Sequence, residues 1–591
     1  MQVDAGKENG ERRRDRDLSD KEIMKITINF RVPTLIYSLE EEQQKKQKLR
    51  FMHPLFHWYH TKAAKEKKKE AKEKEETEFH KFMVPLSPQR PIQSLSKHQS
   101  SNGSYRILRF AILSRLLVIS LICFWRYLAC PYDTSASLNP SCLSVGSTIP
   151  TRSQSSRLPF LGLAIEDSIV WDGVYFVRIA ECGYEYEQTY AFLPLLPICI
   201  YALSQTVFAP LVPILGYRAV LGLSGYVINN LAFLFAAVYF YRLSVFILKD
   251  SNAALRASVL FCFNPASIFY SSLYSESLYA LFSLGGLYHL FSGANTTAVL
   301  LLALSGSARS NGVLNAGYFC FQAMHQSYDA IFRKNQASKS AVRVIIVAAV
   351  RTLCIFTPFI LFQFYGYFNI CLGSLSEEMR PWCKSRLPLG MGFLRYFQLK
   401  QLPNFLLAAP ILSLAVYSTI QYVKLRPEIV FSLGFCSSKE ENNFTSVLDS
   451  PGRDHALKGD QVLEKSFSSK SMQGDPNIRQ RKKRVNEKVS DSFLYPIRSD
   501  HEAYYPSKQG CASMLVLPFV LHLGFMSAVA FFVMHVQVAT RFLSASPPLY
   551  WFASYLMASA GRSRWGYWIW AYCAAYILLG SLLFSNFYPF T

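Results

Sequence analysis

The segment IEDSIVWDGVYFVRIAECGYEYEQTYAFLPLLP, residues 165–197, lies between two strongly apolar parts of the chain and combines carboxylates with many aromatic rings. A carboxylate is costly inside a bilayer, so this mixture is not typical of a membrane span. Tyrosine and tryptophan are instead enriched where a protein meets the membrane surface. We therefore expect the segment to lie at a membrane surface and to carry reacting groups.

The rest of the chain is rich in long apolar runs. Of its 591 residues, 51% are hydrophobic and only 17% are charged, and the charges are clustered. A helix needs about 20 apolar residues to cross the hydrocarbon core of a bilayer. Spans are expected at 105–128, 191–215, 221–248, 342–368, 405–423, 515–533 and 567–583, with shorter apolar segments at 254–270, 278–291 and 298–321. The sequence predicts an all-α polytopic membrane protein.

The net charge of +22 has two interpretations. Basic residues crowd the first hundred positions and the segment 424–508, which is compatible with a nucleic-acid surface. Loops between spans that carry excess lysine and arginine also follow the positive-inside rule, and this interpretation is favoured. We predict no nucleic-acid partner, a largely disordered, basic cytosolic extension at 1–104, and a membrane-embedded domain at 105–591. Within that domain, 129–190 is the first lumenal loop and 426–510 a variable cytosolic loop.

Thirteen cysteines occur without CxxC pairs or zinc-like spacing. Cys130 and Cys142 bracket a short segment after the first expected span and form one candidate lumenal disulfide. Cys371 and Cys383 form a second candidate. Spacing alone does not establish which cysteines pair.

Asp172 is the first candidate for chemistry. If residues 170–181 form a helix, Asp172 lies on one side of it with Tyr175 and Phe176. Partial desolvation against aromatic rings makes a carboxylate a better proton acceptor. The alternative is an exposed acid at a helix start, stabilised by the helix dipole. The residues alone leave both interpretations open.

Two further sets of residues are candidates for binding. Glu181, Tyr186 and Glu187 combine acids with an aromatic ring, which suits carbohydrate but also an ordinary belt of interfacial aromatics. Ionisable and polar side chains among spans are costly and are functional candidates by default. This second set comprises Glu276, Arg309, Asn311, His535, Gln537 and Arg541. Its arginines offer paired donors for a phosphate, and the alternative is snorkelling at a span end.

Motifs of soluble nucleotide chemistry are missing from the membrane part. It contains no Walker loop, no GxGxxG, no HExxH and no DxD acid pair. We therefore expect neither a metal site for a nucleotide sugar nor an ATP motor.

The chain resembles the family of GPI mannosyltransferase 2 enzymes. The resemblance rests on motifs that recur in order from about residue 106 to the end: WDGVYFVRIAECGYEYEQTYAFLPLLP, NPASIFYSSLYSE, ARSNG, PWC, YFQLKQLPNFLLAAP, MHVQVATRFL, PPLYW and NFYPFT. Residues 1–104 and the loop around 436–508 fall outside it. Cys182 stands where the family motif leads us to expect a histidine, which argues against essential chemistry at that position.

The resemblance implies a multi-span helical bundle of the GT-C type in the endoplasmic reticulum membrane, with catalytic loops in the lumen. The implied donor is dolichyl-phosphate mannose, and the acceptor is a mannosyl-glucosaminyl-phosphatidylinositol lipid that gains an α-1,6-linked mannose with inversion. Asp172 is the implied base. Arg309, Arg541 and His535 are candidates for binding the leaving phosphate. No metal or other cofactor is expected, and a small membrane accessory subunit is a candidate partner.

Three alternatives remain at this stage. A transporter of lipid-linked glycans also places charges among spans, but it predicts paired repeats and broken helices near mid-membrane. A membrane scaffold predicts that the lumenal acids can be replaced freely. A mannosyltransferase of another glycan pathway in the endoplasmic reticulum is the nearest competitor within the enzyme class.

Overall fold

The computed structural model describes residues 97–132, 142, 157–333, 338–372, 383, 394, 396–435, 513–559 and 564–588. The predicted disorder of 1–104 falls almost entirely outside these residues, as does most of the loop 426–510. Every regular element within the described residues is a helix, which confirms the predicted all-α class.

Six helical segments in the described part of the chain are long and apolar enough to cross a membrane, which confirms a multi-pass membrane protein. They are built on α4 (Lys97–Leu128), α9 (Tyr217–Leu248), α15 (Ser338–Tyr367), α17 (Leu402–Leu425), α20 (Leu517–Phe532) and α23 (Trp565–Ser585). The span expected at 191–215 is instead a pair bent by 68°. It consists of α7 (Leu195–Gln205), η2 (Ala209–Leu211) and α8 (Val212–Leu215). Prolines at the starts of η2 and α8 explain the break, since they donate no backbone hydrogen bond.

Shorter helices fill the space between these spans. They are α5 (Pro159–Asp167), α6 (Asp172–Cys182), η1 (Glu187–Ala191), α10 (Ser251–Cys262), α11 (Ser267–Ser271), α12 (Glu276–Phe291), α13 (Asn295–Ala308), η3 (Ser310–Asn315), α14 (Ala316–Tyr328), the π-helix η4 (Asp329–Arg333), the π-helix η5 (Phe368–Leu372), η6 (Leu399–Gln401), α18 (Pro427–Phe431), η9 (Met514–Val516), η10 (Val536–Val538), α21 (Ala539–Leu543) and α22 (Pro547–Ser559). The segment expected at 254–270 is therefore broken into α10 and α11, and the one expected at 298–321 into α13, η3 and α14. The break after α13 lies at Arg309, one of the charged residues described below.

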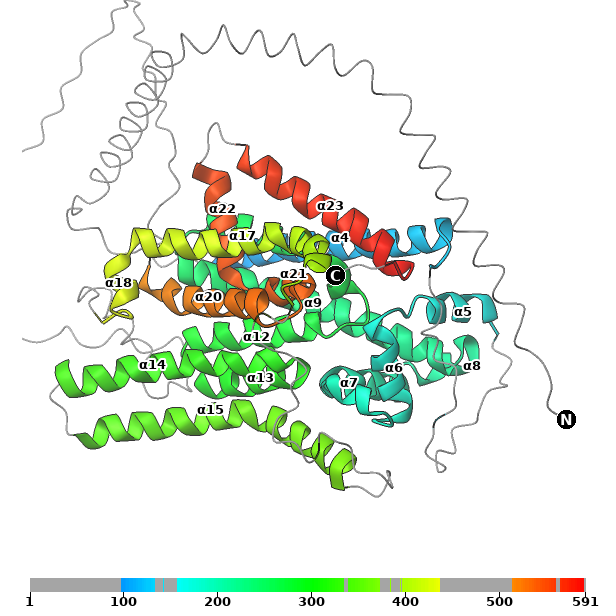
Figure 1. The fold of residues 1–591 in the computed structure, drawn as a ribbon, viewed down its shortest axis with the longest axis horizontal. Helices are drawn as coiled ribbons and strands as arrows, with labels where there is room; N and C mark the ends of the chain where they lie inside the picture. Colours follow the sequence, from blue (N-terminus) through cyan, green and yellow to red (C-terminus); the bar gives the residue numbers. More distant parts are fainter. Residues whose placement is uncertain are drawn as a thin grey trace, which may run out of the picture. The chain divides into compact units, whose positions relative to one another are not determined.

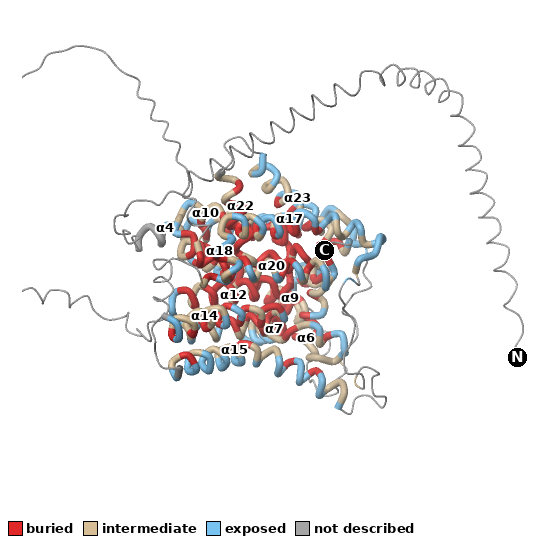
Figure 2. The backbone as a smooth tube through the Cα atoms, turned by 60° about the vertical axis from the view of Figure 1, so that its left-hand side comes forward, coloured by how far each residue is buried: buried red, intermediate tan, exposed pale blue. Residues whose placement is uncertain are grey.

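The helices pack around α9 and α12, which contact each other along their lengths. Figure 1 shows α12, α13, α14, α15, α17 and α20 running along one direction, with α5, α6, α7 and α8 gathered at one end. Buried residues concentrate in the centre of the bundle, whereas α15 is mostly exposed at its edge (Figure 2). The centre contains stacked rings of Phe233, Phe240 and Phe261, with centroids 5.3 and 4.7 Å apart.

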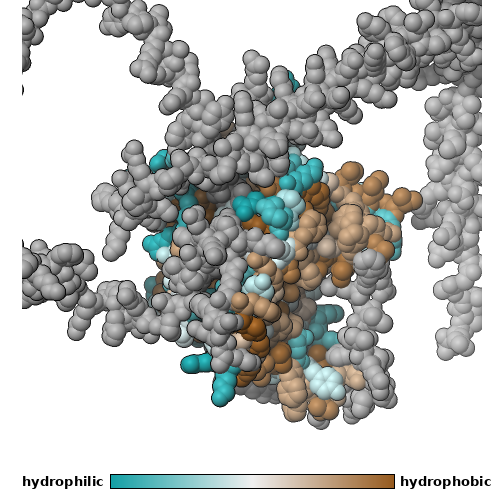
Figure 3. Space-filling model, turned by 90° about the vertical axis from the view of Figure 1, so that its left-hand side faces the viewer, coloured by the Kyte–Doolittle hydropathy of each residue, from teal (hydrophilic) through white to brown (hydrophobic). Residues whose placement is uncertain are grey.

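The exposed surface of the bundle is largely apolar, as a membrane protein requires. Exposed large side chains along α15 include Val342, Ile346, Leu353 and Phe364. Figure 3 shows hydrophobic side chains covering much of the described surface on one face, with hydrophilic ones beside them. Apolar side chains in such numbers on a water-exposed surface are unusual, so this surface is suited to lipid.

Two segments expected as loops contain helices. The segment HVQVATRFLSASPPLYW was expected to lie wholly in one lumenal loop, but its second half begins α22, which enters the bundle: Trp551 Nε1 donates to Ser244 Oγ of α9 at 2.8 Å. Because α22 has only 13 residues and starts with two prolines, it resembles a turn in sequence. The expected loop 426–510 also begins with a short helix, α18, whose Ile429 is fully buried.

The disulfides match the expectation in one case. Cys371 pairs with Cys383 as predicted. The pair Cys130–Cys142 is wrong: Cys142 bonds to Cys182, the last residue of α6, and Cys130 is free. Folding brings the end of α6 to Cys142 from 40 residues away, which spacing did not reveal. Cys182 therefore has a structural role.

Candidate active site

Four charged side chains from distant parts of the sequence meet at one end of the bundle. Asp172 begins α6, Glu276 begins α12, Arg309 lies between α13 and η3, and Arg541 belongs to α21. Arg541 Nε donates to Glu276 Oε1 at 2.8 Å, and its Nη2 lies 3.3 Å from Asp172 Oδ2. Arg309 Nη1 pairs with the same Oε1 atom of Glu276. We call these four residues the charged cluster.

Glu276 holds the two cations together. Its side chain is only 2% exposed, and one of its oxygens accepts from both guanidinium groups. A buried carboxylate flanked by two arginines remains ionised and is a poor proton acceptor, because a proton would compete with two positive charges. The other oxygen, Oε2, is buried and has no hydrogen-bond partner among the described residues. It can accept a hydrogen bond from a bound molecule.

Two aromatic rings lie against Arg541. The guanidinium carbon is 4.6 Å from the ring centre of Phe269 and 4.5 Å from that of Tyr274, distances typical of cation–π contacts. Burial opposes the charge of Arg541, but the carboxylate of Glu276 together with Tyr274 and Asp172 raises the pKa of Arg541 above its usual value. The Tyr274 hydroxyl accepts a hydrogen bond from the backbone N–H of Asp172 at 3.1 Å. Burial and the nearby Asp172 carboxylate raise the pKa of Tyr274, which therefore stays protonated.

Asp172 differs from Glu276 in its surroundings. Its side chain is 37% exposed, and its contact to Arg541, at 3.3 Å, is longer than that of Glu276. The structure contains features of both interpretations drawn from the sequence, because Asp172 is the first residue of α6 and also lies beside an aromatic ring. Of the two carboxylates in the charged cluster, Asp172 is the more exposed.

The turn around Arg309 is set by a close approach of two backbones. A Cβ atom on Gly312 would lie 2.3 Å from the carbonyl oxygen of Ser305, so a side chain does not fit there. Asn311, one residue earlier, is buried, and its Nδ2 has no partner among the described residues. Near Arg309 there are thus one hydrogen-bond donor, Asn311 Nδ2, and one acceptor, Glu276 Oε2, that have no partner among the described residues.

His535 and Gln537 lie in a separate polar group just before α21. Tyr396 donates its hydroxyl hydrogen to Gln537 Oε1 at 3.3 Å, and its ring packs edge-on against His535 at 4.8 Å. Asn404 Nδ2 donates to the same Tyr396 hydroxyl at 2.9 Å. The motifs YFQLKQLPN and HVQVATRF therefore come together, and Gln537 precedes Arg541 by about one helical turn.

The remaining predicted binding residues lie away from the charged cluster. Glu181, near the other end of α6, pairs with Arg218 of α9 at 3.1 Å. Tyr186 lies 5.9 Å below the guanidinium of Arg178, and Glu187 is exposed in η1. The structure thus does not join these three to Asp172.

One group of described residues has the spacing of a metal site. Cys142, Cys182 and Glu185 bring their ligand atoms within 4.8 Å of one another. Both sulfurs are already joined in the disulfide, and Glu185 pairs with Arg178 at 2.7 Å. This group therefore has no thiolate to offer, since a disulfide sulfur carries no negative charge.

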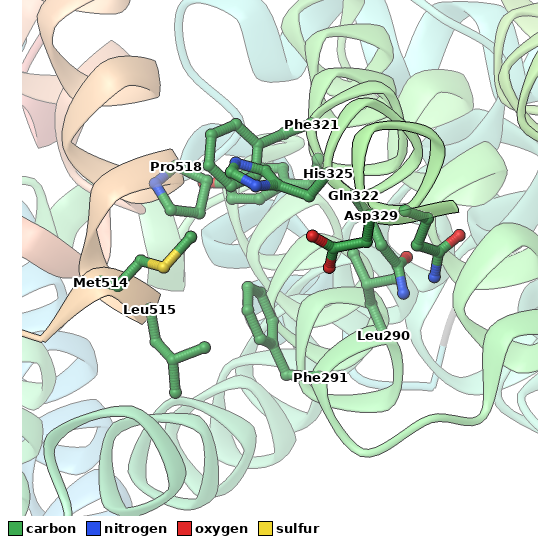
Figure 4. A pocket seen from close by; sticks show the side chains of 11 residues that line it. Leu290, Phe291, Phe321, Gln322, His325, Asp329, Met514, Leu515 and Pro518 are labelled. Carbon is green, nitrogen blue, oxygen red and sulfur yellow. The ribbon is translucent and has the colours of Figure 1, made fainter. Parts of the chain in front are cut away.

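A cavity of about 50 Å³ lies between α12, α14 and α20. Figure 4 shows Phe321 and His325 of α14 lining it with Met514, Leu515 and Pro518. Its α12 residues are Leu290 and Phe291, whereas Glu276 starts the same helix, roughly 22 Å away at 1.5 Å per residue. One sugar cannot touch both places, so the cavity is distinct from the charged cluster.

Residues around the charged cluster that the sequence did not single out include Phe269, Tyr274 and Trp171. Tyr274 was quoted only as part of NPASIFYSSLYSE, although its position two residues before Glu276 was the available signal. Trp171 falls inside the helix expected at 170–181, but it precedes α6 and has φ 53° and ψ −131°. No pattern in the sequence indicated this backbone conformation.

The fold and the charged cluster define a class: a polytopic membrane protein with reactive groups gathered at one end of its helical bundle. The chain belongs to the family described as mannosyltransferase (PIG-V), whose model matches residues 104–591. It is thus a glycosyltransferase of the mannosyltransferase type, and the match covers all the described helices beyond the start of α4.

Known relatives agree with this family. The human protein named GPI alpha-1,6-mannosyltransferase 2 is 27% identical over 489 residues, covering 76% of this chain and 83% of the relative. The Drosophila melanogaster protein named GPI mannosyltransferase 2 is 28% identical over 469 residues, covering 71% and 86% respectively. No solved structure matches the chain.

Proposed function

We propose that the protein adds the second, α-1,6-linked mannose to the precursor of the glycosylphosphatidylinositol anchor, with dolichyl-phosphate mannose as the donor. The relatives named for this activity support the acceptor and the linkage. The chemistry rests on the charged cluster, where the half-exposed Asp172 lies beside Arg541, and the buried Glu276 holds Arg541 and Arg309 together. A phosphate-linked donor fits these cations, because guanidinium groups bind phosphate oxygens with paired hydrogen bonds.

The reaction is a single in-line displacement. Asp172 takes the proton of the acceptor 6-hydroxyl as that oxygen forms its bond to the mannose anomeric carbon. The bond from that carbon to the phosphate oxygen breaks, and dolichyl phosphate leaves with the electron pair. Inversion at the anomeric carbon converts the β-linked donor to an α-linked product. Asp172 suits this role because it is the more exposed of the two carboxylates.

Arg309 and Arg541 stabilise the phosphate as its negative charge grows. Glu276 holds both guanidinium groups on one oxygen, which keeps the two cations together in a largely buried place. His535 belongs to the polar group around Tyr396, just before α21, and we assign it to the same phosphate because Arg541 lies on α21. Asn311, Gln537 and the free oxygen of Glu276 are the groups we assign to sugar hydroxyls.

Glu181, Tyr186 and Glu187 belong to a more distant part of the acceptor site. Their position near the end of α6 suits a long acceptor that carries several sugars and a phosphoinositol. The protein acts in the endoplasmic reticulum membrane, with the charged cluster on the lumenal side and without a metal ion. A small membrane accessory subunit is a further partner that the family resemblance suggests.

Complementation tests this function. The full chain is expressed in cells that lack the second GPI mannosyltransferase, and surface GPI-anchored proteins and lipid intermediates are measured. Restored surface proteins, with loss of the accumulated one-mannose precursor, are expected. If instead the precursor persists while another mannosylated lipid changes, the enzyme belongs to another glycan pathway. Movement of a glycolipid across the membrane without added mannose would identify a transporter.

A further inference from the structure

Trp171 has an unusual backbone conformation directly before the proposed base. Its φ of 53° and ψ of −131° fall in a region that side chains other than glycine rarely adopt. Such a conformation persists only where the surrounding structure holds it, and it often occurs at functional sites. The contacts that hold Trp171 therefore also affect the position of Asp172.

The C-terminal end of α23 supplies those contacts. Trp171 Nε1 donates to the carbonyl oxygen of Phe584 at 3.2 Å, and its ring lies 5.9 Å from that of Phe587. This end is itself fixed to α4, because Arg126 Nη1 donates to Ser585 O at 3.1 Å and Trp125 Nε1 to Ser581 Oγ at 3.0 Å. Trp171 is thus anchored to a part of the molecule that is tied down elsewhere.

Phe584 also supports the other half of the charged cluster. Its side chain is buried, and its ring lies 5.3 Å from Phe269 and 5.4 Å from Tyr274. These are the two rings that lie against the guanidinium of Arg541. Phe584 therefore contacts Trp171, which precedes Asp172, through its carbonyl oxygen. Through its ring it contacts Phe269 and Tyr274, which lie against Arg541.

We propose that Trp171 and Phe584 are positioning residues that hold Asp172 and Arg541 in their relative places. This inference rests on the proposed function, in which Asp172 is the base. The proposal also gives a role to the C-terminal motif that begins at Asn586. Phe587 of this motif packs against Trp171, and Ser585, just before it, accepts a hydrogen bond from Arg126 of α4. Neither positioning residue touches the reacting atoms, and both act through neighbours that do.

Steady-state kinetics of the purified full chain test the proposal. Trp171→Phe keeps a ring but loses the N–H donor, and Phe584→Leu loses the ring edge. Because small displacements of reacting groups can cost up to about 10²-fold in rate, we expect kcat to fall about 10- to 100-fold with KM for both lipids nearly unchanged. The matched control is Phe519→Leu, an equally buried ring that packs against Trp551 and Phe291. It should keep kcat, and thermal unfolding should show all three variants folded.

Two further variants separate positioning from a general structural role. Trp171→Gly accommodates the backbone conformation without strain but lacks the anchor, so it should be at least as slow as Trp171→Phe. A glycine variant with normal kcat would overturn the proposal. In an Asp172→Asn background, Trp171→Phe should lower kcat little further, since both changes act through the carboxylate of Asp172. An equal loss in both backgrounds would also overturn it.

The same measurements distinguish the two levels of inference. If Asp172→Asn is slow while Trp171→Phe and Phe584→Leu retain normal kcat, the positioning role fails and the proposed base stands. If Asp172→Asn retains normal kcat, the base assignment itself fails, and the role of positioning that base fails with it.

Discussion

Replacing Glu276 with glutamine removes the one negative charge that lies between two guanidinium groups. Both Arg309 and Arg541 pair with Oε1 of Glu276, whose side chain is only 2% exposed. At an effective dielectric constant of about 20, an ion pair at 4 Å gains about 4 kcal/mol, so two pairs gain about 8 kcal/mol before desolvation. Desolvation offsets several kcal/mol per ion.

The net effect of Glu276→Gln is therefore smaller than the Coulomb sum. Removing one partner of a buried ion pair typically costs about 3–5 kcal/mol, because the remaining charge stays buried and unpaired. Here Arg309 loses its ionic partner and Arg541 keeps only the longer contact to Asp172, so we expect a loss of about 3 kcal/mol in the free energy of unfolding. The retained amide oxygen still accepts one hydrogen bond, which keeps the loss from being larger.

Thermal unfolding of the purified full chain in detergent measures this loss. The matched control is Glu428→Gln, which breaks the Arg426–Glu428 pair, where Glu428 is 56% exposed. Exposed pairs contribute about 0–1 kcal/mol, so this variant should unfold near the wild-type temperature. Equal unfolding temperatures for the two glutamine variants would contradict a stabilising role for the buried pairs of Glu276.

Three further changes have definite expected outcomes. Gly312→Ala forces apart the backbones at the turn after Arg309, and microsomal mannosyl transfer should fall at least about 10-fold; near-normal activity would contradict the close approach. Cys142→Ser opens a 40-residue loop and should cost about 2–4 kcal/mol in unfolding experiments, whereas Cys130→Ser should change nothing; equal effects would contradict the pairing to Cys182. Burial raises the pKa of Glu166 above its usual value, so the stability of the folded state falls as pH rises through that folded pKa. Glu166→Gln should therefore raise the unfolding temperature at about pH 8 and leave it unchanged near about pH 4; the reverse order would contradict the sign.

Hydropathy was enough to predict the long spans, because about 20 apolar residues in a row have few other structural solutions. It failed where helices are short or broken. The break at Arg309 depends on Gly312 approaching Ser305, a contact between separate backbone segments. The entry of α22 into the bundle depends on packing by residues such as Trp551.

The sequence indicated which charged residues are functional candidates, but not which of them contact one another. The cost of ionisable groups among spans singled out Glu276, Arg309 and Arg541. The pairing of Glu276 with both arginines could not be predicted, because Arg541 is 265 positions away from Glu276 in the chain and only the fold brings them together. The conformation of Trp171 depends on contacts from the end of α23, so no local pattern could reveal it.

The central claim is that this chain transfers a second mannose with Asp172 as the base. The most direct measurement supplies purified full-length protein with dolichyl-phosphate mannose and the one-mannose GPI precursor, followed by linkage analysis of the product. We predict a two-mannose lipid with an α-1,6 linkage, formed about 10²–10⁴-fold more slowly by Asp172→Asn. A wild-type enzyme that leaves this acceptor unchanged, or an asparagine variant that works at the normal rate, would contradict the account.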